Sequence, residues 1–163
     1  MGEGAGGGEQ LNLCSPHLNP LPPGERKYFI GQGKLMVPGL TGKSEMVVKE
    51  EDLVSHLGNV PVAVLSTPRL IQLLETAAVD AIRDLIPTDQ VSLGTEVRIR
   101  HLSATPLGMK VTANALLKSV EGNRLCFFVD AYDEKEKVAE GEHERVLVSK
   151  ERFLQRVEKK RAG

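Results

Sequence analysis

The chain has 163 residues, a formal net charge of −1, and 40% hydrophobic and 26% charged residues, which is typical of one soluble domain with a real core. It lacks the basic surplus of a nucleic-acid-binding protein, the apolar run of about 18 residues that spans a bilayer, and the basic and apolar start of a secretion signal. Its two cysteines, Cys14 and Cys126, are too distant in sequence for a disulfide framework or a zinc site. We therefore expect a cytoplasmic protein that binds neither nucleic acid nor membrane.

The N-terminal region is dominated by glycine and proline. Residues 1–36 contain most of the low-complexity sequence, and such segments bury too little apolar surface to offset the entropy of ordering. We predict that 1–36 form a disordered tail and that 37–163 form a single domain.

Residues 43–49 are predicted to form a first strand, followed by a short helix that begins at the acidic run 50–52. The long helix of the chain is predicted over 66–86. Pro68 favours its first turn and Pro87 ends it.

Alternating or apolar strand patterns follow this helix in four stretches, at 91–102, 109–120, 125–132 and 138–148. A charged C-terminal helix over 150–161 keeps Phe153, Leu154 and Val157 for docking. Consecutive strands joined by short turns should pair antiparallel, and the long helix is the element that can cover their sheet. The predicted fold class is α+β, with an antiparallel sheet wrapped around one helix.

Glu75 lies off the polar stripe of the long helix, and its neighbours on the helix surface are Ile71, Ala78, Val79 and Ile82. A carboxylate in such surroundings is costly unless it has a partner or reaches a cavity. Two interpretations stay open: a functional acid, or a residue at the flank that pairs with an arginine of the sheet or extends to solvent.

His101 continues one face of its strand, which we expect to carry Leu93, Thr95, Val97 and Ile99 as well. A lone inward histidine is more often a core residue than a catalyst. A carboxylate on the helix and an imidazole on the sheet that share one pocket would, however, form an acid–base pair.

Thr67 precedes Pro68 and is predicted to be the N-cap of the long helix. A helix N-terminus also suits an oxyanion or a thioester carbonyl. Thr67 lies two turns, about 12 Å along the axis, before Glu75, so the two side chains could bracket a small acyl group without touching.

Four further positions draw attention on the strands. Gly94 indicates a bulge or a close backbone approach. Arg145 could pair with a carboxylate, and His143, on the same face of the last strand, is interpreted as structural. Cys126 alternates with apolar residues and is interpreted as a core residue.

These positions fall in stretches that resemble the fluoroacetyl-CoA thioesterase family of hotdog-fold proteins. The stretches are Pro38-Gly39-Leu40-Thr41-Gly42, Leu65-Ser66-Thr67-Pro68, Leu93-Gly94-Thr95, His101-Leu102-Ser103-Ala104-Thr105-Pro106-Leu107-Gly108 and Gly141-Glu142-His143-Glu144-Arg145. The resemblance covers residues 37–157 without large gaps.

The resemblance implies a hotdog fold, a homodimer that joins two sheets edge to edge, and hydrolysis of an acyl-CoA thioester without a metal or other cofactor. It places the catalytic set on Thr67, Glu75 and His101, and the substrate-binding glycine and arginine on Gly94 and Arg145. The fluoroacetyl-specific member closes its pocket with a lid that bears a phenylalanine. Residues 57–64 contain no aromatic residue here, so we expect a different small or medium acyl group.

Two other functions fit the same residues. A non-hydrolytic module would use the pocket to bind an acyl-CoA, and a hotdog enoyl-CoA hydratase or dehydratase would use the histidine and carboxylate on a β-hydroxyacyl group. Within hydrolysis, Glu75 is either a general base toward water or a nucleophile that forms an anhydride.

Overall fold

The computed structural model describes residues 30–31, 34–58 and 61–163. In chain order the elements are β1 (Ile30–Gly31), β2 (Lys34–Leu35), β3 (Thr41–Val47), the 3₁₀ helices η1 (Glu50–Asp52) and η2 (Val54–Leu57), α1 (Thr67–Ile82), the 3₁₀ helix η3 (Arg83–Leu85), β4 (Gln90–His101), β5 (Lys110–Glu121), β6 (Arg124–Asp133), β7 (Lys137–Ser149) and α2 (Lys150–Ala162).

Most of the predicted tail lies outside the described residues. Within its last part, β1 and β2 pair antiparallel, and the side chain of Met36 is fully buried in the core. Structured chain therefore begins before residue 37, where the prediction placed the start of the domain.

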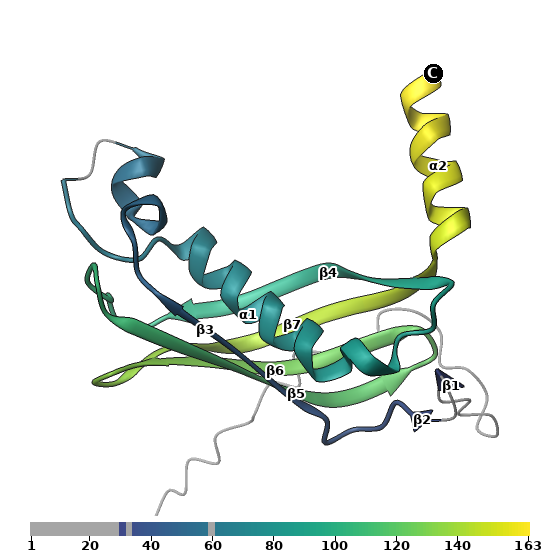
Figure 1. Ribbon diagram of the computed structural model, residues 1–163, viewed down its shortest axis with the longest axis horizontal. Helices are drawn as coiled ribbons and strands as arrows, with labels where there is room; N and C mark the ends of the chain where they lie inside the picture. Colours follow the sequence, from purple (N-terminus) through teal and green to yellow (C-terminus); the bar gives the residue numbers. More distant parts are fainter. Residues whose placement is uncertain (1–29, 32–33, 59–60) are drawn as a thin grey trace, which may run out of the picture.

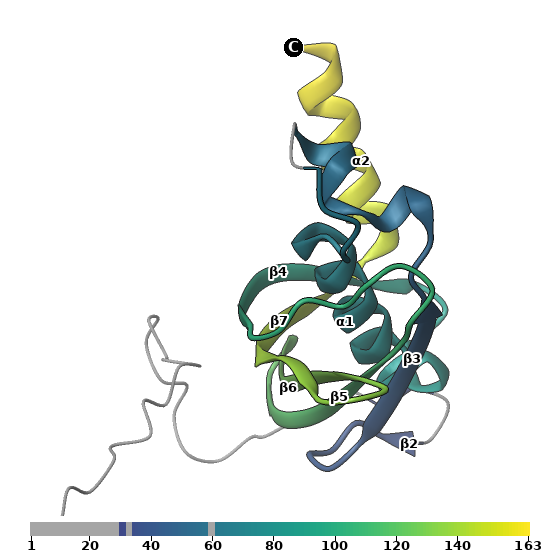
Figure 2. The same cartoon turned by 90° about the vertical axis from the view of Figure 1, so that its left-hand side faces the viewer.

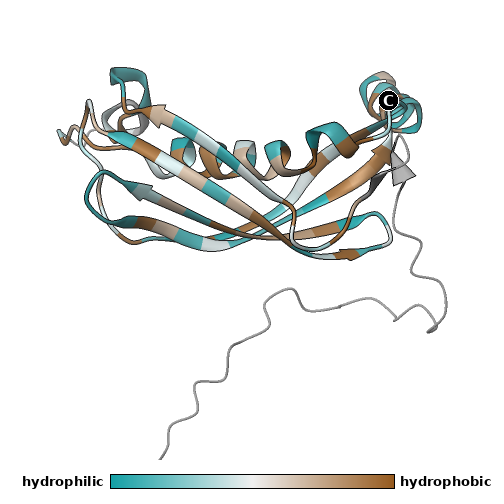
Figure 3. Cartoon of the chain, turned by 60° about the horizontal axis from the view of Figure 1, so that its bottom comes forward, coloured by the Kyte–Doolittle hydropathy of each residue, from teal (hydrophilic) through white to brown (hydrophobic). Residues whose placement is uncertain are grey.

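Five strands form one antiparallel sheet in the order β3-β5-β6-β7-β4. The sheet curls around α1, which lies on its concave side (Figures 1 and 2). Along the strands, apolar and polar residues alternate (Figure 3), so one face of the sheet packs on the helix. This arrangement confirms the predicted α+β class with a sheet wrapped around one helix.

The prediction that consecutive strands pair is correct for β5–β6 and β6–β7 but wrong for β4, which pairs with β7 rather than with β5. The connection from β4 to β5 crosses the N-terminal end of α1 instead of turning back on itself. Leu65 N–H donates to the carbonyl of Thr105 at 2.8 Å, and Val64 forms a bridge with Pro106. β3 and β4 are left as the two edges of the sheet.

The inward face of α1 is apolar and closely packed. Its buried residues are Leu70, Leu73, Leu74, Ala77, Ala78, Ala81 and Ile82. Opposite the alanines, Gly42 brings β3 against the helix backbone, because a Cβ at this position would lie 2.2 Å from the carbonyl oxygen of Ala77. The backbone N–H of Lys43 also donates to Asp80 Oδ2 at 3.0 Å. Backbone contact therefore fixes how closely α1 and β3 approach each other.

Helix α2 extends away from the sheet and helix (Figures 1 and 2). Ser149 caps it by accepting a hydrogen bond from Arg152 N–H. Leu154 and Val157 keep 51% and 44% of their surface exposed, and Phe153 is partly buried, so the residues predicted to dock do not pack into the core of the described chain. In that part of the molecule, no helix has the length and apolar character to cross a membrane.

Cys126 is buried on β6, as expected of a core residue. It is disulfide-bonded, however, which corrects the expectation that the cysteines stay unpaired.

We predict that Gly42→Ala destabilises the fold. The new methyl group would collide with the backbone of α1 at Ala77 and Ala81, and backbone cannot move aside as a flexible side chain can. The free energy of unfolding, measured by urea denaturation, should fall by about 3 kcal/mol, at the upper end of the usual cost of overpacking. Gly58→Ala is the matched control, because a Cβ there meets nothing within 4 Å. Equal stability of the two variants would contradict the close approach.

Candidate active site

Thr67 and His101 meet at the N-terminus of α1. Thr67 Oγ1 lies 3.0 Å from His101 Nδ1, which is hydrogen-bond distance. The N-cap of α1 is Ser66, and Thr67 is the first helical residue. The prediction that Thr67 is the N-cap is therefore wrong, and its hydroxyl is directed to the imidazole instead. The other ring nitrogen of His101, Nε2, is buried, and a backbone interaction with Ser103 raises the pKa of the imidazole against the effect of burial.

The N-terminus of α1 is held in place by the buried Asp52. The Asp52 backbone carbonyl accepts from Ser66 N–H at 2.9 Å, and its Oδ1 pairs with Arg69 Nε at 2.5 Å. Asp52 Oδ2 accepts from Lys49 N–H at 2.9 Å. One carboxylate thus ties η1 to the first turn of the helix, which fixes the position of Thr67.

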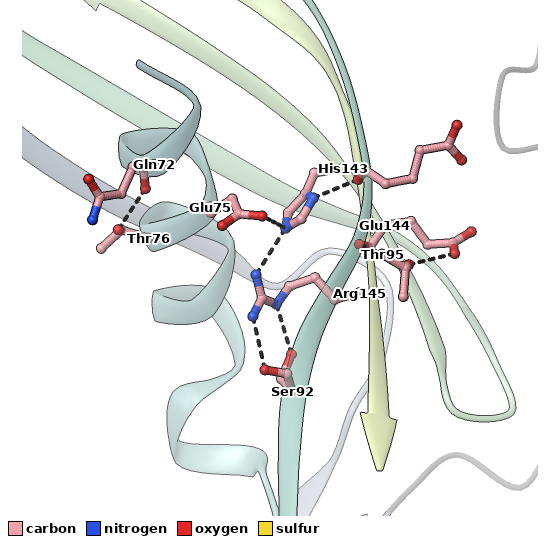
Figure 4. A network of polar contacts seen from close by, with 9 residues as sticks. Gln72, Glu75, Thr76, Ser92, Thr95, His143, Glu144 and Arg145 are labelled. Carbon is pink, nitrogen blue, oxygen red and sulfur yellow. Dashed lines mark hydrogen bonds and ion pairs between the residues drawn. The ribbon is translucent and has the colours of Figure 1, made fainter. Parts of the chain in front are cut away.

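Glu75 faces a second polar cluster, which comes from β4 and β7 (Figure 4). Its Oε1 lies 3.8 Å from Nε2 of His143, and its side chain remains 39% exposed. Nε2 of His143 also lies 3.0 Å from Arg145 Nη1. Arg145 in turn donates from Nε to Ser92 Oγ at 2.8 Å and from Nη2 to the Ser92 carbonyl at 3.0 Å. We call Glu75, His143, Arg145 and Ser92 the Glu75 cluster.

Gly94 provides the space for this cluster. A Cβ at Gly94 would lie 2.6 Å from Glu75 Oε1 and 3.1 Å from His143 Cε1. The pairing of β4 with β7 shifts between Gly94 and Glu96, so that Thr95 is an extra residue in a β-bulge. The predicted close backbone approach at Gly94 is confirmed.

The same bulge corrects the predicted face of β4. Alternation had placed Leu93 and Thr95 on one face with His101. Because the bulge changes the phase, Gly94 instead faces α1. Thr95 points to the other side of the sheet, where its hydroxyl donates to Glu144 Oε1 at 2.8 Å.

Burial dominates the electrostatics of both histidines. It lowers the pKa of His101 below its ordinary value. It also lowers the pKa of His143, an effect that the neighbouring Arg145 reinforces and that the Glu96 carbonyl and Glu75 oppose. Burial lowers the pKa of Arg145 as well, while Glu75 raises it. Both imidazoles are therefore biased toward their neutral form.

Within one chain, the Thr67–His101 pair and the Glu75 cluster are separate. Thr67 and Glu75 are two helical turns apart, about 12 Å along the axis. His143 pairs with Val97, and His101 lies four residues farther along β4, about 13 Å. The imidazole beside Glu75 is thus His143, not His101 as the sequence suggested.

His143 and Ser92 are the members of the site to which the sequence analysis assigned no functional role. His143 was interpreted as structural, although its position two residues before Arg145 on the same strand face was the available signal. Nothing in the local sequence distinguishes Ser92. No group of three or more histidine, cysteine or acidic side chains in the described part of the chain could hold a metal ion.

Comparisons with known proteins give a consistent result. The family model of fluoroacetyl-CoA-specific thioesterases matches residues 48–151. The fluoroacetyl-CoA thioesterase of Streptantibioticus cattleyicolor is 38% identical over 97 residues, which make up 60% of this chain and 70% of that protein.

Solved structures agree. A fluoroacetyl-CoA thioesterase superposes with a TM-score of 0.73 at 34% identity, covering 78% of this chain and 98% of that one. A thioesterase superfamily member from Thermus thermophilus superposes with a TM-score of 0.69 at 29% identity, covering 76% and 93% of the two chains. A hotdog-like protein from Thermanaerovibrio acidaminovorans gives a TM-score of 0.70 at 28% identity, covering 76% and 91%. The resemblance in the sequence is confirmed: the chain has the hotdog fold and belongs to the fluoroacetyl-CoA-specific thioesterase family.

Proposed function

We propose that this protein hydrolyses an acyl-CoA thioester to the free acid and CoA. The observation that carries the proposal is the 3.0 Å contact between Thr67 Oγ1 and His101 Nδ1 at the N-terminus of α1, in a chain of a thioesterase family. Related structures support an acyl-CoA ligand: one fluoroacetyl-CoA thioesterase variant was solved with acetyl-CoA, and another with fluoroacetate and CoA.

The N-terminus of α1 suits the thioester carbonyl. The amides of Thr67 and Arg69 have no partner within the helix, and Pro68 has no amide N–H to offer. These donors and the helix dipole favour an oxygen that gains negative charge. The backbone amide of Gly94 is the alternative donor. The Thr67 hydroxyl would hydrogen-bond the reacting centre from the same side.

Glu75 is the proposed acid–base group. It takes a proton from water while the water oxygen attacks the carbonyl carbon, and the C–S bond then breaks as CoA leaves and is protonated to the thiol. In the alternative, a Glu75 carboxylate oxygen attacks the carbonyl carbon, the C–S bond breaks as CoA leaves and is protonated to the thiol, and water then hydrolyses the anhydride to the free acid and Glu75. His101 orients the water or the carboxylate and moves a proton, and the buried guanidinium of Arg145 sets the charge of the pocket.

A homodimer would bring the two separate parts together. β4 is an edge strand, paired only with β7 among the described strands, and such an edge can pair with another strand. A two-fold axis that joins two β4 edges also sets the two α1 helices antiparallel. With the axis near Ile71, midway between Thr67 and Glu75, each Thr67–His101 pair faces Glu75 of the partner subunit. We propose that each active site is shared in this way.

The proposed substrate carries a small or medium acyl group other than fluoroacetyl. The segment 57–64, which begins at the last residue of η2, contains no aromatic side chain. It therefore offers no equivalent of the phenylalanine lid that the family resemblance attributes to the fluoroacetyl-specific member.

A panel of acyl-CoA thioesters, with the released thiol detected, tests the reaction. We expect turnover of at least one substrate and a fall in kcat of about 10²–10⁴-fold in Glu75→Gln, the usual contribution of a general base. Glu51→Gln, which removes an exposed carboxylate of η1, is the matched control and should keep the wild-type rate. No thiol release from any substrate would contradict hydrolysis, and wild-type rates no better than Glu75→Gln on every substrate would contradict the role of Glu75. Tight binding without turnover would favour a binding module. Conversion of an enoyl-CoA without thiol release would favour a hydratase.

Gly94→Ala should lower activity while the fold is kept. Its methyl group would displace the Glu75 carboxylate, which is the end of a flexible side chain and can move at little cost in stability. A displacement of about 1 Å at a reacting group can cost about 10²-fold in rate. We expect a fall in kcat of that order and only a small fall in the thermal midpoint, since the methyl group would also press on His143 Cε1, 3.1 Å away. Unchanged activity would show that Glu75 does not need its place against β4.

Mixed dimers test the shared site. Glu75→Gln and His101→Ala should each be nearly inactive alone. After the two proteins are unfolded and refolded together, half of the dimers are mixed, and each mixed dimer has one intact site. Activity should recover to about a quarter of the wild-type rate. If each chain holds a whole site, mixing restores nothing. A monomer in analytical ultracentrifugation would also contradict the proposal.

A further inference from the structure

His143 is buried, and both of its ring nitrogens have defined partners. Nδ1 lies 2.8 Å from the backbone carbonyl oxygen of Glu96, and Nε2 lies 3.0 Å from Arg145 Nη1. The ring also stacks on the fully buried Phe127, with ring centroids 6.4 Å apart. The imidazole is therefore fixed in position, plane and rotation.

These two partners determine where the proton of His143 is. A carbonyl oxygen only accepts, so Nδ1 carries the hydrogen and donates it to Glu96. A guanidinium only donates, so Nε2 presents its lone pair to Arg145. The resting imidazole is neutral, and its lone-pair nitrogen is the one that faces Glu75 at 3.8 Å.

Arg145 is held from two sides. Ser92 accepts from Nε and Nη2, and His143 accepts from Nη1. This leaves the guanidinium beside Glu75, whose negative charge raises the pKa of Arg145. The Glu75 carboxylate thus faces a fixed cation and a neutral imidazole (Figure 4).

We propose that His143 is a positioning residue for Glu75. His143 holds Arg145 beside the Glu75 carboxylate. Because the imidazole is neutral, it leaves the carboxylate oxygens free to act on water or on the thioester. This inference rests on the proposed function of Glu75. A protonated His143 would carry a hydrogen on Nε2, release Arg145, and donate to Glu75. The carboxylate would then be occupied, so protonation of His143 would switch the site off.

The surrounding charges favour the neutral state. The charged groups that face the ring are Arg145 on its own strand and Glu75 on α1, while β4 contributes only the Glu96 carbonyl and the Gly94 backbone. Glu144 lies on the opposite face of β7 and acts only at a distance. Burial and Arg145 lower the pKa of His143, and they outweigh Glu96, Glu75 and Glu144, which raise it.

Two substitutions separate the two ring nitrogens. His143→Asn keeps an N–H that can reach the Glu96 carbonyl but loses the acceptor for Arg145. His143→Gln places an amide oxygen near the position of Nε2 and stays neutral at every pH. We expect kcat to fall about 10- to 100-fold in His143→Asn with a smaller change in KM, because a reacting group is displaced rather than lost. His143→Gln should recover most of this loss, and the acidic limb of its kcat/KM profile should shift to lower pH.

Phe127→Leu is the control for packing. It removes the stacked ring but keeps an apolar side chain and both hydrogen-bond partners of His143, so it should lower stability and move the acidic limb less than His143→Gln does. A purely structural His143 predicts equal losses for His143→Asn and His143→Gln and an unmoved limb in both, and that result would overturn the proposal.

An NMR titration of ¹⁵N-labelled histidine gives a readout that does not depend on turnover. At neutral pH His143 should be neutral, with the hydrogen on Nδ1. In Glu75→Gln its pKa should fall further, because a carboxylate that raises it has been removed. A hydrogen on Nε2, or a pKa that Glu75→Gln leaves unchanged, would refute the positioning role even if the enzyme is active. An inactive wild type with the expected tautomer and coupling would instead refute the proposed function.

The same titration predicts a pH dependence of stability. The folded pKa of His143 lies below its ordinary value of 6.5, so the unfolded chain binds more protons as the pH falls through 6.5. The free energy of unfolding should therefore decrease from about pH 6.5 downward. His143→Gln should flatten this decrease, and His101, whose pKa is lowered by burial, contributes to the part of the decrease that is left. An equal slope in His143→Gln and wild type would contradict the neutral, buried state.

Discussion

The close approach of Glu75 to the backbone of β4 at Gly94 is the contact on which the site depends. A side chain at Gly94 would occupy the place of the carboxylate oxygen. The bulge at Thr95 turns Gly94 toward α1 and, one residue later, places the Glu96 carbonyl where His143 can donate to it. One extra residue in a strand thus opens the space for the carboxylate and also orients the imidazole beside it. Bulges commonly re-aim side chains in this way next to functional sites.

The position of α1 relative to the sheet is fixed at both ends by backbone contacts. At its N-terminus, Asp52 bonds to Ser66 N–H and pairs with Arg69. Toward its C-terminus, Gly42 allows contact between β3 and the helix backbone. Thr67 and Glu75 lie between these two points. Their spacing is therefore a property of a rigid helix rather than of a loop, which suits groups that must meet one small acyl substrate.

The periodic features of this chain could be predicted from the sequence. The alternation predicted over 109–120 is confirmed on β5, where Val111, Ala113, Ala115 and Leu117 share a buried face, and the helical period predicted over 66–86 is confirmed by the apolar buried face of α1. Alternation failed on β4, because a bulge changes the phase of a strand without changing its composition, and Gly94 was its one local sign. The Gly94 approach itself was predicted, and it is the part of the site that the sequence defined best.

The remaining errors concern contacts between elements. The short connection 102–109 suggested a hairpin, whereas it crosses the end of α1 and sends β4 to the far side of β7. For the same reason, the choice of His143 over His101 as the neighbour of Glu75 could not be made from spacing along either strand. It depends on which strand packs against α1 at the level of Glu75, and the tertiary structure determines this. The exposed apolar residues of α2 are a further example, since an amphipathic pattern predicts a helix but does not identify the surface against which that helix packs.

The composition of the Glu75 cluster argues for function over stability. Arg145 is a guanidinium with 6% of its surface exposed, and its hydrogen-bond partners Ser92 and His143 are both neutral. Desolvating a charge among neutral partners costs free energy, and well-packed apolar residues in such a place often give equal or greater stability. Glu75 is the facing anion, and at 39% exposure it is too open to solvent to compensate by charge alone. A cluster that holds a cation against a half-exposed carboxylate therefore adds little to the stability of the fold. Its arrangement is better explained by the carboxylate that it leaves accessible.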